Sequence, residues 1–341
     1  MDVQLFEKQW EKLSERLKEN KKIIITTHQN PDGDAIGSVM GLYWYLKKCG
    51  KDVSVIVPNE YPLFLQWLPG NDQIIDYKKN RSEAKLLIEQ AEIIFHLDYN
   101  DLGRSGDLKN KLKKSKATKV LIDHHPYPQL EADISISDTT VSSTAEMVLE
   151  MILKLGGTDA LDINIGTCLY LGIMTDTGCF SFNSSNPRTF ELVSLLLKSG
   201  IKKDEIFSLV YDNFSANRMK LMGYCLHEKM QVLPDYNAAY ISLSMEEQER
   251  FDFAVGDSEG FVNLPLSIKG IIFTALFVER EDKIKISLRS RGDFAVNTIS
   301  EKYFNGGGHK NAAGGESKLS LSETIEQFVS VLPNYSKELN A

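Results

Sequence analysis

Hydrophobic and polar positions alternate along the chain with two periods, and in the first half they predict strands separated by helices. Short apolar runs rich in β-branched residues are typical of strands, and longer runs with helical periodicity are typical of helices. The predicted strands are 22–27, 52–57, 92–97 and 119–122, and the predicted helices are 35–49, 147–155 and 160–174. This alternation indicates an α/β domain whose parallel sheet is covered by helices on both faces.

The second half of the chain has a different pattern. Three successive helices are predicted, over 187–198, 202–210 and 216–230, and β-rich segments return from Tyr236. The later predicted elements are strands over 238–243, 271–279 and 283–288 and a helix over 294–303. We therefore predict three parts, which are an N-terminal α/β domain over 1–185, a helical linker over 186–235 and a smaller α/β C-terminal domain over 236–341.

Composition narrows the class of protein. The 341 residues are 42% hydrophobic and 25% charged, as in ordinary globular proteins, and the net charge is −8. The N-terminus lacks a signal-peptide pattern, no apolar run approaches ~18–20 residues, and the four cysteines show no paired spacing. We expect a reduced, cytoplasmic protein that neither spans a membrane nor binds long duplex nucleic acid, which needs a broad basic surface.

Acidic and histidine residues follow the predicted strands and buried helices. They are His28, Asp32, Asp34, Asp98, Asp123, His124, His125 and Asp176. Because parallel strands end at one edge of a sheet, these side chains are expected to converge, and divalent cations would neutralise their like charges. Each segment alone has a plainer explanation, such as a turn at Asn30–Gly33 or a helix cap at Asp176. Taken together, they favour a metal site.

Two local patterns bear on how this site is built. Gly33 and Gly37 would leave room for a ligand near the beginning of a helix. Ser143 and Glu146 have the spacing of a capping box, in which each side chain binds the other residue's main-chain N–H.

The motifs resemble those of a known family. HQNPDGDAIGS, LDYND, IDHHP and TDTGCF are similar to the four motifs of the DHH phosphoesterases, in the same order. The string GGGHKNAAGG, residues 306–315, resembles the signature of the DHH-associated C-terminal domain. Within that family, the length and layout are most similar to the stand-alone nano-RNase and 3′-phosphoadenosine-5′-phosphate (pAp) phosphatase group.

The resemblance implies two metal ions. His28 and Asp32 would hold one ion, Asp34 and His124 the other, with Asp98 bridging them and Asp176 completing the set. Asp123 would orient the neighbouring imidazole, and His125 would contact the scissile phosphate as a ligand or proton donor. Mixed carboxylate and imidazole ligands favour Mn²⁺ over Mg²⁺, which prefers oxygen ligands.

Candidate substrate-binding residues lie mostly near the C-terminus. Arg289 and Arg291 would share one face of a strand if the strand continues that far, and arginine forks suit phosphate. The resemblance implies nucleotide binding by Arg289, His309 and the adjacent glycines, Gly307 and Gly308. Further candidates are Arg104, Ser143 and Asn183, and for each of these three the alternative is a loop or cap role.

The expected activity is hydrolysis of short oligoribonucleotides and linear dinucleotides such as pApA to mononucleotides, and of pAp to AMP. One alternative is an inorganic pyrophosphatase or exopolyphosphatase, which would use the same N-terminal chemistry. The other is a nucleotide-sensing binding protein. The expected partners are therefore short RNA and pAp, and a homodimer is left open.

Overall fold

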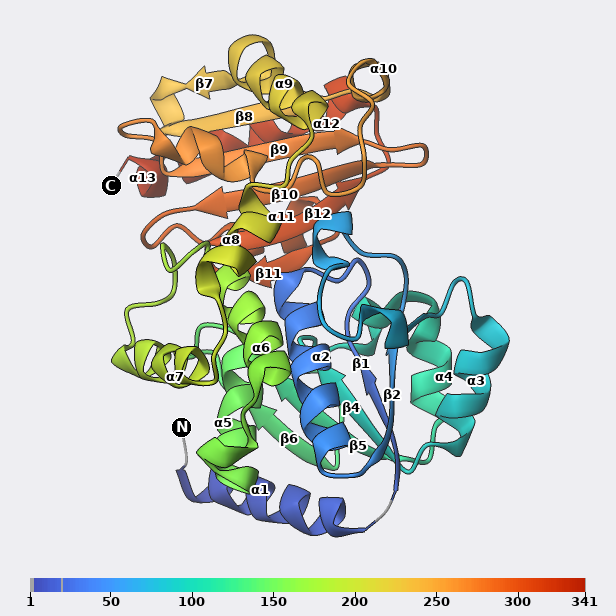
Figure 1. The fold of residues 1–341 in the computed structure, drawn as a ribbon. Coiled ribbons are helices and arrows are strands. Elements are labelled where there is room, and N and C mark those ends of the chain that lie inside the picture. Colours follow the sequence, from blue (N-terminus) through green and yellow to red (C-terminus); the bar gives the residue numbers. More distant parts are fainter. Residues whose placement is uncertain (1–2, 20, 341) are drawn as a thin grey trace. The chain divides into compact units, whose positions relative to one another are not determined.

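The computed structural model describes residues 3–19 and 21–340, which belong to two compact units (Figure 1). The first unit is Met1–Asn213 and the second is Phe214–Ala341. Their boundary falls inside the segment 186–235 that the sequence predicts as a helical linker. The helices α7 (Pro187–Lys198) and α8 (Lys203–Tyr211) belong to the first unit, and α9 (Ala216–Tyr224) belongs to the second.

The first unit contains a sheet of six parallel strands in the order β3-β2-β1-β4-β5-β6. The strands are β1 (Lys22–Thr26), β2 (Asp52–Val57), β3 (Ile74–Asp76), β4 (Ile93–Leu97), β5 (Thr118–Asp123) and β6 (Ile134–Ser137). The chain runs outward from β1 to β3, then crosses to β4 and continues in the opposite direction to β6. In open parallel sheets, ligands bind at the carboxyl ends of the strands where the order reverses, which is here between β1 and β4.

Helices cover both faces of this sheet, as the sequence predicts (Figure 1). They are α1 (Val3–Lys18), α2 (Gly33–Lys48), α3 (Arg81–Gln90), α4 (Lys109–Lys114), α5 (Thr144–Gly156) and α6 (Ile163–Asp176), followed by α7 and α8. Ile23 and Ile25 of β1 pack into the core formed with α1, α2, α5 and α6. Ile24 points to the other face and packs with α3 and α4. Both faces are apolar, so these strands are continuous hydrophobic runs.

The helices α2 and α6 pack closely because glycines line their contact. A Cβ atom at Gly37 would lie 2.5 Å from the carbonyl oxygen of Cys168 and 2.8 Å from the main-chain nitrogen of Gly172. At Gly33 a Cβ atom would collide with the side chain of Thr175. The expectation that Gly33 and Gly37 leave room for a ligand is therefore wrong, since the second helix fills that space.

The second unit is built on a mixed sheet in the order β11-β12-β10-β9-β8-β7, in which only β8 and β9 pair in parallel among the described strands. Its strands are β7 (Gln231–Leu233), β8 (Ala238–Leu243), β9 (Phe273–Glu279), β10 (Ile284–Ser290), β11 (Gly307–His309) and β12 (Ala312–Ser317). Its helices after α9 are α10 (Met245–Arg250), α11 (Val296–Tyr303), α12 (Leu321–Val331) and α13 (Ser336–Leu339). Phe277 packs with α11 and α12 on one face, and Leu276 packs with α9 on the other.

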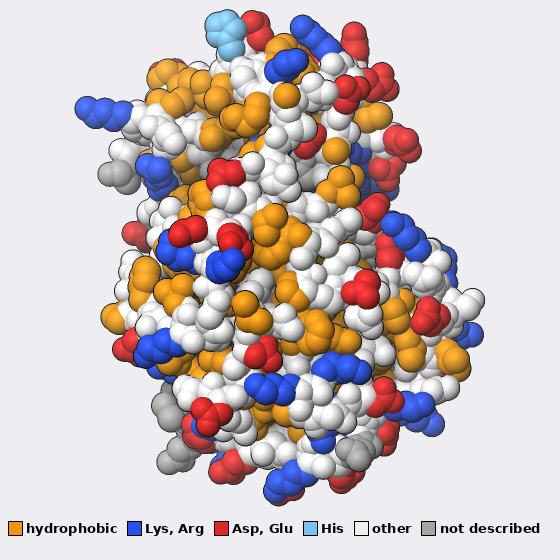
Figure 2. Space-filling model, in the orientation of Figure 1, with side chains coloured by type: hydrophobic (Ala, Val, Ile, Leu, Met, Phe, Trp, Pro, Cys, Tyr) orange, Lys and Arg blue, Asp and Glu red, His pale blue; other side chains and the backbone are white. Residues whose placement is uncertain are grey.

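One predicted helix changes character along its length. The segment 216–230 is α-helical only as far as Tyr224, and a π-helical turn over Cys225–Lys229 follows. Among the described residues, no helix combines the length and apolar character needed to cross a membrane. On the visible face, Lys and Arg side chains are intermixed with Asp and Glu (Figure 2).

Candidate metal centre

Three neighbouring strands bring most of the predicted ligands to one edge of the first unit's sheet. His28 lies two residues beyond the end of β1, Asp98 directly follows β4, and Asp123 is the last residue of β5. His124 and His125 continue from Asp123. Because β1, β4 and β5 are adjacent and parallel, their carboxyl ends lie together at this edge.

The two closely packed helices supply the remaining ligands. Asp32 is the N-cap of α2, where its Oδ1 accepts the main-chain N–H of Ala35 at 3.1 Å, and Asp34 lies in the first turn. Asp176 is the last residue of α6. The side chains of Asp32 and Asp176 are 47% and 29% exposed, whereas those of His28, Asp34, Asp98 and His124 are at most 8% exposed. Solvent therefore reaches the cluster past Asp32 and Asp176.

Donor atoms converge in overlapping groups that could each hold a metal ion. Those formed entirely by the first unit are His28, Asp32 and Asp98; Asp34, His124 and Asp176; and Asp98, Asp123 and His125, with donor atoms within 4.8 Å of one another. Nε2 of His28 lies 3.3 Å from Oδ2 of Asp98, and Nε2 of His124 lies 3.6 Å from Oδ1 of Asp98. His124 Nε2 also lies 3.5 Å from Asp176 Oδ2 and 3.8 Å from Asp34 Oδ2.

The conformation of His28 suits a cation. Its Nδ1 lies 2.9 Å from the carbonyl oxygen of Gln29, which can only accept, so Nδ1 carries a proton. In the neutral ring, the lone pair of Nε2 then faces the carboxylate of Asp98. Two electron-rich atoms at this distance need a proton or a metal ion between them. A divalent cation bound by Nε2 satisfies both.

The electrostatics of the buried acids also fit a cation. Burial raises the pKa of Asp34 well above its usual range, and the charges of Asp98, Asp176 and Asp32 raise it further. The pKa of His124 is raised despite its burial, because Asp176, Asp98 and other carboxylates favour the protonated ring. The clustered carboxylates therefore favour positive charge between them, which protons or divalent metal ions would supply.

The main chain holds Asp98 in an uncommon conformation. Its φ angle is +64°, in the left-handed region that non-glycine residues seldom adopt, and its N–H donates to the carbonyl of Ile122 at 3.2 Å. Burial would raise the pKa of Asp98, but hydrogen bonding with His28 and the charges of His125 and His124 hold it below its usual range. Strained residues of this kind persist where their surroundings fix them, and they concentrate at functional sites.

Asp123 holds one imidazole, that of His125. Its Oδ1 lies 2.8 Å from Nδ1 of His125, and its Oδ2 accepts the main-chain N–H of His125 at 3.1 Å. Burial raises the pKa of Asp123 to about 7, with Asp98 adding to the shift. The histidine that Asp123 orients is thus His125.

Two further predicted site residues are Arg104, in a 3-10 helix over Leu102–Leu108, and Asn183, in a loop. Arg104 is half-buried, its carbonyl accepts the main-chain N–H of Gln29 at 2.6 Å, and its charge acts on the pKa of His28 and Asp123. Asn183 is exposed, with a φ of +42°, and its Nδ2 donates to the carbonyl of Val141 at 3.2 Å. Arg104 therefore lies beside the cluster, and Asn183 connects two loops.

Ser143 is fully buried as the N-cap of α5, and its hydroxyl accepts the N–H of Glu146 at 3.1 Å. The reciprocal half of the predicted capping box is not formed. The Glu146 carboxylate instead accepts the N–H and hydroxyl of Ser142, at 3.2 and 2.5 Å, and the hydroxyl of Thr189 at 3.0 Å. A substrate contact by Ser143 stays a prediction.

One residue at this edge is not singled out by the sequence. Thr144, the first residue of α5, donates its N–H to Asp34 and its hydroxyl to Asp98, at 2.7 and 3.0 Å. The neighbouring N–H of Ala145 donates to Asp34 at 2.9 Å. No local spacing signals these bonds, because they join residues more than 45 positions apart.

In the second unit, the predicted nucleotide-binding residues lie on β10 and β11. Both Arg289 and His309 pair with Ala312 of β12, from opposite sides, so their side chains share one face of the sheet. Gly307 pairs with Gly314 and Gly308 with Ala313. The predicted sharing of a strand face by Arg289 and Arg291 is not formed, because β10 ends at Ser290 and Arg291 lies beyond it.

The glycine-rich string forms a hairpin with close main-chain contacts. Gly308 has a φ of +137°, and a Cβ atom there would lie 2.6 Å from the carbonyl oxygen of Ala312. Glycine is therefore needed at this position for β11 to pair with β12. The pairing alone explains the glycine, without a contact to a ligand.

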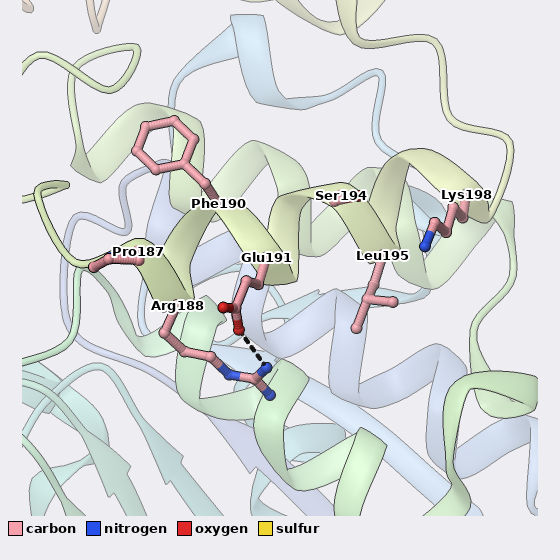
Figure 3. A pocket seen from close by; sticks show the side chains of 7 residues that line it. All are labelled: Pro187, Arg188, Phe190, Glu191, Ser194, Leu195 and Lys198. Atoms are coloured by element: carbon pink, nitrogen blue, oxygen red, sulfur yellow. Dashed lines mark hydrogen bonds and ion pairs between the residues drawn. The ribbon is translucent and has the colours of Figure 1, made fainter.

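A surface hollow elsewhere on the first unit contains none of the predicted ligands. It lies along one side of α7, between Pro187 and Lys198, and Arg188 forms an ion pair there with Glu191 at 3.0 Å (Figure 3). Arg188 also pairs with Glu150 at 2.6 Å. With Arg188 and Glu191 paired, this hollow lacks the converging donors of the metal centre.

Comparison with known proteins identifies both units. Residues 22–173 match the DHH family, N-terminal domain, and residues 236–338 match the DHHA1 domain. Two similar proteins are named bifunctional oligoribonuclease and PAP phosphatase NrnA. The one from Thermus thermophilus is 30% identical over 308 residues, covering 90% of this chain and 88% of its own, and the one from Bacillus subtilis is 28% identical over 295 residues, covering 86% and 88%.

Among solved structures, an exopolyphosphatase-related protein from Bacteroides fragilis superposes with a TM-score of 0.94 and 43% identity, covering 98% of each chain. The matched domains, the order of the motifs and the extent of these similarities lead to one conclusion: the chain belongs to the DHH family and carries a DHHA1 domain after its DHH domain.

Proposed function

We propose that this DHH-family protein is a two-metal phosphoesterase that hydrolyses short oligoribonucleotides, such as pApA, to mononucleotides and pAp to AMP. The observation that carries the proposal is the placement of Asp98, whose two carboxylate oxygens lie 3.3 Å from His28 and 3.6 Å from His124. A carboxylate facing two donor groups can bridge two cations, and paired cations suit the hydrolysis of phosphate esters. The names of the similar proteins support the substrate class.

We assign two divalent ions to the centre, with Mn²⁺ as the metal. His28 and Asp32 would hold one ion, and Asp34, His124 and Asp176 the other, with Asp98 between them. Four of these side chains are carboxylates and two are imidazoles, a mixture that suits Mn²⁺ better than Mg²⁺. Bound there, the ions would supply positive charge that polarises water and neutralises the phosphate.

The chain's own groups would place and protonate the substrate. Asp123 engages Nδ1 of His125, so Nε2 is the ring nitrogen that would serve the phosphate or the leaving oxygen. Arg104 would add positive charge beside His28. In the second unit, Arg289 and His309 share one face of the sheet and would bind the nucleotide part, together with Gly307 and Gly308.

Two alternatives use the same cluster differently. An exopolyphosphatase or inorganic pyrophosphatase would hydrolyse phosphoanhydrides, and the name of the Bacteroides fragilis structure is the observation that favours it. A nucleotide-sensing protein would bind the same ligands with little turnover. The intact set of donor atoms argues against the sensor, because a binding protein does not need a bridging carboxylate.

A turnover assay with purified protein and Mn²⁺ tests these possibilities together. Its substrates are pApA, pAp, pyrophosphate and polyphosphate, with a chelator as the negative control. Hydrolysis of pApA and pAp, abolished by the chelator and restored by Mn²⁺, is the expected result. Faster hydrolysis of pyrophosphate or polyphosphate would favour the phosphoanhydride alternative, and nucleotide binding without turnover would favour the sensor.

Substrate length gives a second measurement. The net charge of −8 offers no broad basic track, so activity is expected to fall as an RNA lengthens beyond roughly five nucleotides. Equal rates on a dinucleotide and on a long structured RNA would contradict the assignment to short substrates.

A further inference from the structure

Thr144 forms hydrogen bonds with two candidate metal ligands that belong to different donor groups, Asp34 and Asp98. It is fully buried at the first position of α5, its main-chain N–H donates to Asp34 Oδ2 at 2.7 Å, and its hydroxyl donates to Asp98 Oδ1 at 3.0 Å. Asp98 belongs to one donor group with His28 and Asp32, while Asp34 belongs to another with His124 and Asp176. One residue therefore fixes a carboxylate of each group.

The two imidazoles that approach Asp98 use the atom that a metal ion would need. Both His28 and His124 face this carboxylate through Nε2. A ring nitrogen that gives its lone pair to a cation can no longer donate a hydrogen bond. When the centre is loaded, these contacts with Asp98 are lost as hydrogen bonds, while the Thr144 hydroxyl can still donate.

Asp98 needs such a restraint because of its main chain. Its left-handed φ of +64° is unfavourable for a residue with a side chain, so the surroundings must hold it. The hydroxyl of Thr144 adds a directional bond without adding charge. Its β-branched side chain also has few rotamers, which limits the freedom of that bond.

We propose that Thr144 is a positioning residue of the metal centre, with its hydroxyl holding Asp98 and its N–H holding Asp34 so that the two donor groups keep one geometry. The inference rests on the proposed metal-dependent function, but it concerns metal affinity and can be measured without substrate. It predicts that loss of the hydroxyl alone weakens metal binding.

The test compares Thr144→Val with Thr144→Ser by calorimetric titration of the metal-free full chain with Mn²⁺. The Val variant keeps the shape and the N–H but loses the hydroxyl, and its dissociation constant for Mn²⁺ should rise about 10- to 100-fold, the usual effect of losing a group that orients a ligand. The Ser variant keeps the hydroxyl and should stay within about threefold of wild type. The kcat on pApA should follow the same order.

Thr189→Val is the matched control. Thr189 is also fully buried, and its hydroxyl also donates to a carboxylate, that of Glu146 on α5, at 3.0 Å. This carboxylate is not among the metal-binding groups. Removing that hydroxyl should lower the melting temperature while leaving the dissociation constant for Mn²⁺ near the wild-type value. If Thr144→Val does not fold, Thr144→Ala removes the same hydroxyl with a smaller side chain.

Three outcomes overturn the proposal. One is wild-type Mn²⁺ affinity in the folded hydroxyl-less variant, and another is equal weakening by Thr189→Val, which would indicate a general packing effect. The third is a loss in Thr144→Ser as large as in Thr144→Val. A wild-type chain that binds no Mn²⁺ would overturn the metal centre itself, whereas Mn²⁺ binding without hydrolysis of pApA would overturn only the proposed function.

Discussion

Asp123 and His125 contact each other twice, through Nδ1 of the ring at 2.8 Å from Oδ1 and through the main-chain N–H at 3.1 Å from Oδ2. Both carboxylate oxygens are thus used to fix one imidazole, and the side chain of Asp123 is fully buried. An asparagine has only one acceptor oxygen, so it can keep both contacts only by donating its NH₂ to Nδ1, which would move the ring proton to Nε2.

Asp123→Asn is therefore expected to lower kcat on pApA by about 10- to 100-fold, since a misoriented imidazole is a poorer acid or ligand. Steady-state kinetics at saturating Mn²⁺ measure the effect. Asp133→Asn is the control, because Asp133 is a carboxylate that accepts a main-chain N–H, that of Lys119, outside the metal-binding groups. Unchanged kcat in Asp123→Asn would show that His125 does not act in the reaction.

Asp98→Asn should remove almost all turnover. The loss is expected to be on the order of 10³-fold or more, because metal ions held there would supply several kcal/mol of transition-state stabilisation and each 1.36 kcal/mol is tenfold. Mn²⁺ titration and kcat are measured together. Asp101→Asn, which alters an exposed cap three residues later, should retain both. Near-wild-type kcat in Asp98→Asn would exclude a bridging role.

Arg289→Ala and His309→Ala should separate substrate binding from metal binding. Loss of one charge-assisted phosphate contact costs about 1.5–3 kcal/mol, so kcat/KM on pApA should fall about ten- to a hundredfold. The affinity for Mn²⁺ should barely change in either variant. Lys283→Ala removes a charge directly before β10, where it pairs with Glu316 of β12, and serves as the control. A His309→Ala variant that loses Mn²⁺ but keeps its affinity for substrate would place His309 among the metal ligands.

The stability of the metal-free protein should depend on His96. This ring is fully buried on β4, and burial lowers its pKa to about 3, with Lys119 adding to the shift. Between pH 6.5 and 3 the unfolded state therefore binds one proton more than the folded state, and the free energy of unfolding falls as the pH falls. From pH 6.5 to 5 this loss is about 2 kcal/mol.

The measurement is denaturant unfolding of the wild type and of His96→Gln at pH 7.5 and 5.0, with a chelator present. The glutamine cannot take up a proton but can still bind Tyr99, whose hydroxyl lies 2.5 Å from His96 Nδ1. The variant should lose about 2 kcal/mol less than the wild type over this interval. Equal losses would mean that His96 is protonated in the folded protein.

Gly37→Ala should destabilise the first unit and weaken the metal centre. The new methyl group would clash with main-chain atoms of α6, which cannot shift without moving the helix. Overpacking of this kind lowers the free energy of unfolding by about 1–3 kcal/mol. Because α2 carries Asp34 and α6 ends in Asp176, Mn²⁺ affinity should fall as well. Melting temperature and Mn²⁺ titration report the two effects.

Gly223→Ala is the matched control for this helix glycine. Gly223 lies in α9, and a Cβ atom there would meet no atom within 4 Å. Because alanine favours helix over glycine, this change should be neutral or stabilising by up to about 1 kcal/mol. Equal destabilisation by both variants would show that the contact between α2 and α6 is not the cause.

The sequence predicts those parts of this molecule that depend on neighbours along the chain. The segments β2, β8 and α7 have the predicted bounds, because their apolar periodicity is set locally. The candidate ligands are also predictable, since a motif names the residues and parallel strands bring their carboxyl ends together. Short strands such as β3, β7 and β11, with three residues each, are too brief to show a period.

Contacts between distant segments could not be predicted in this way. Gly37 gives the same local signal whether it faces a ligand or a second helix, and only the packing of α2 against α6 decides between them. The spacing predicts that the carboxylate of Glu146 binds the main-chain N–H of Ser143. In the structure it binds Ser142 instead, together with the hydroxyl of Thr189 on α7. The role of Thr144 depends on Asp34 and Asp98, which come from two other elements.

The wide separation of the ligands along the chain has a consequence for protein synthesis. A growing chain has His28 early, yet the donor group of Asp34, His124 and Asp176 is incomplete until α6 and its last residue, Asp176, have been made. Because α2 requires α6 as its packing partner, the earlier ligands also lack their framework until then. A first unit truncated before α6 should therefore fail to assemble the whole candidate centre, so that the centre would be completed late in the synthesis of this unit.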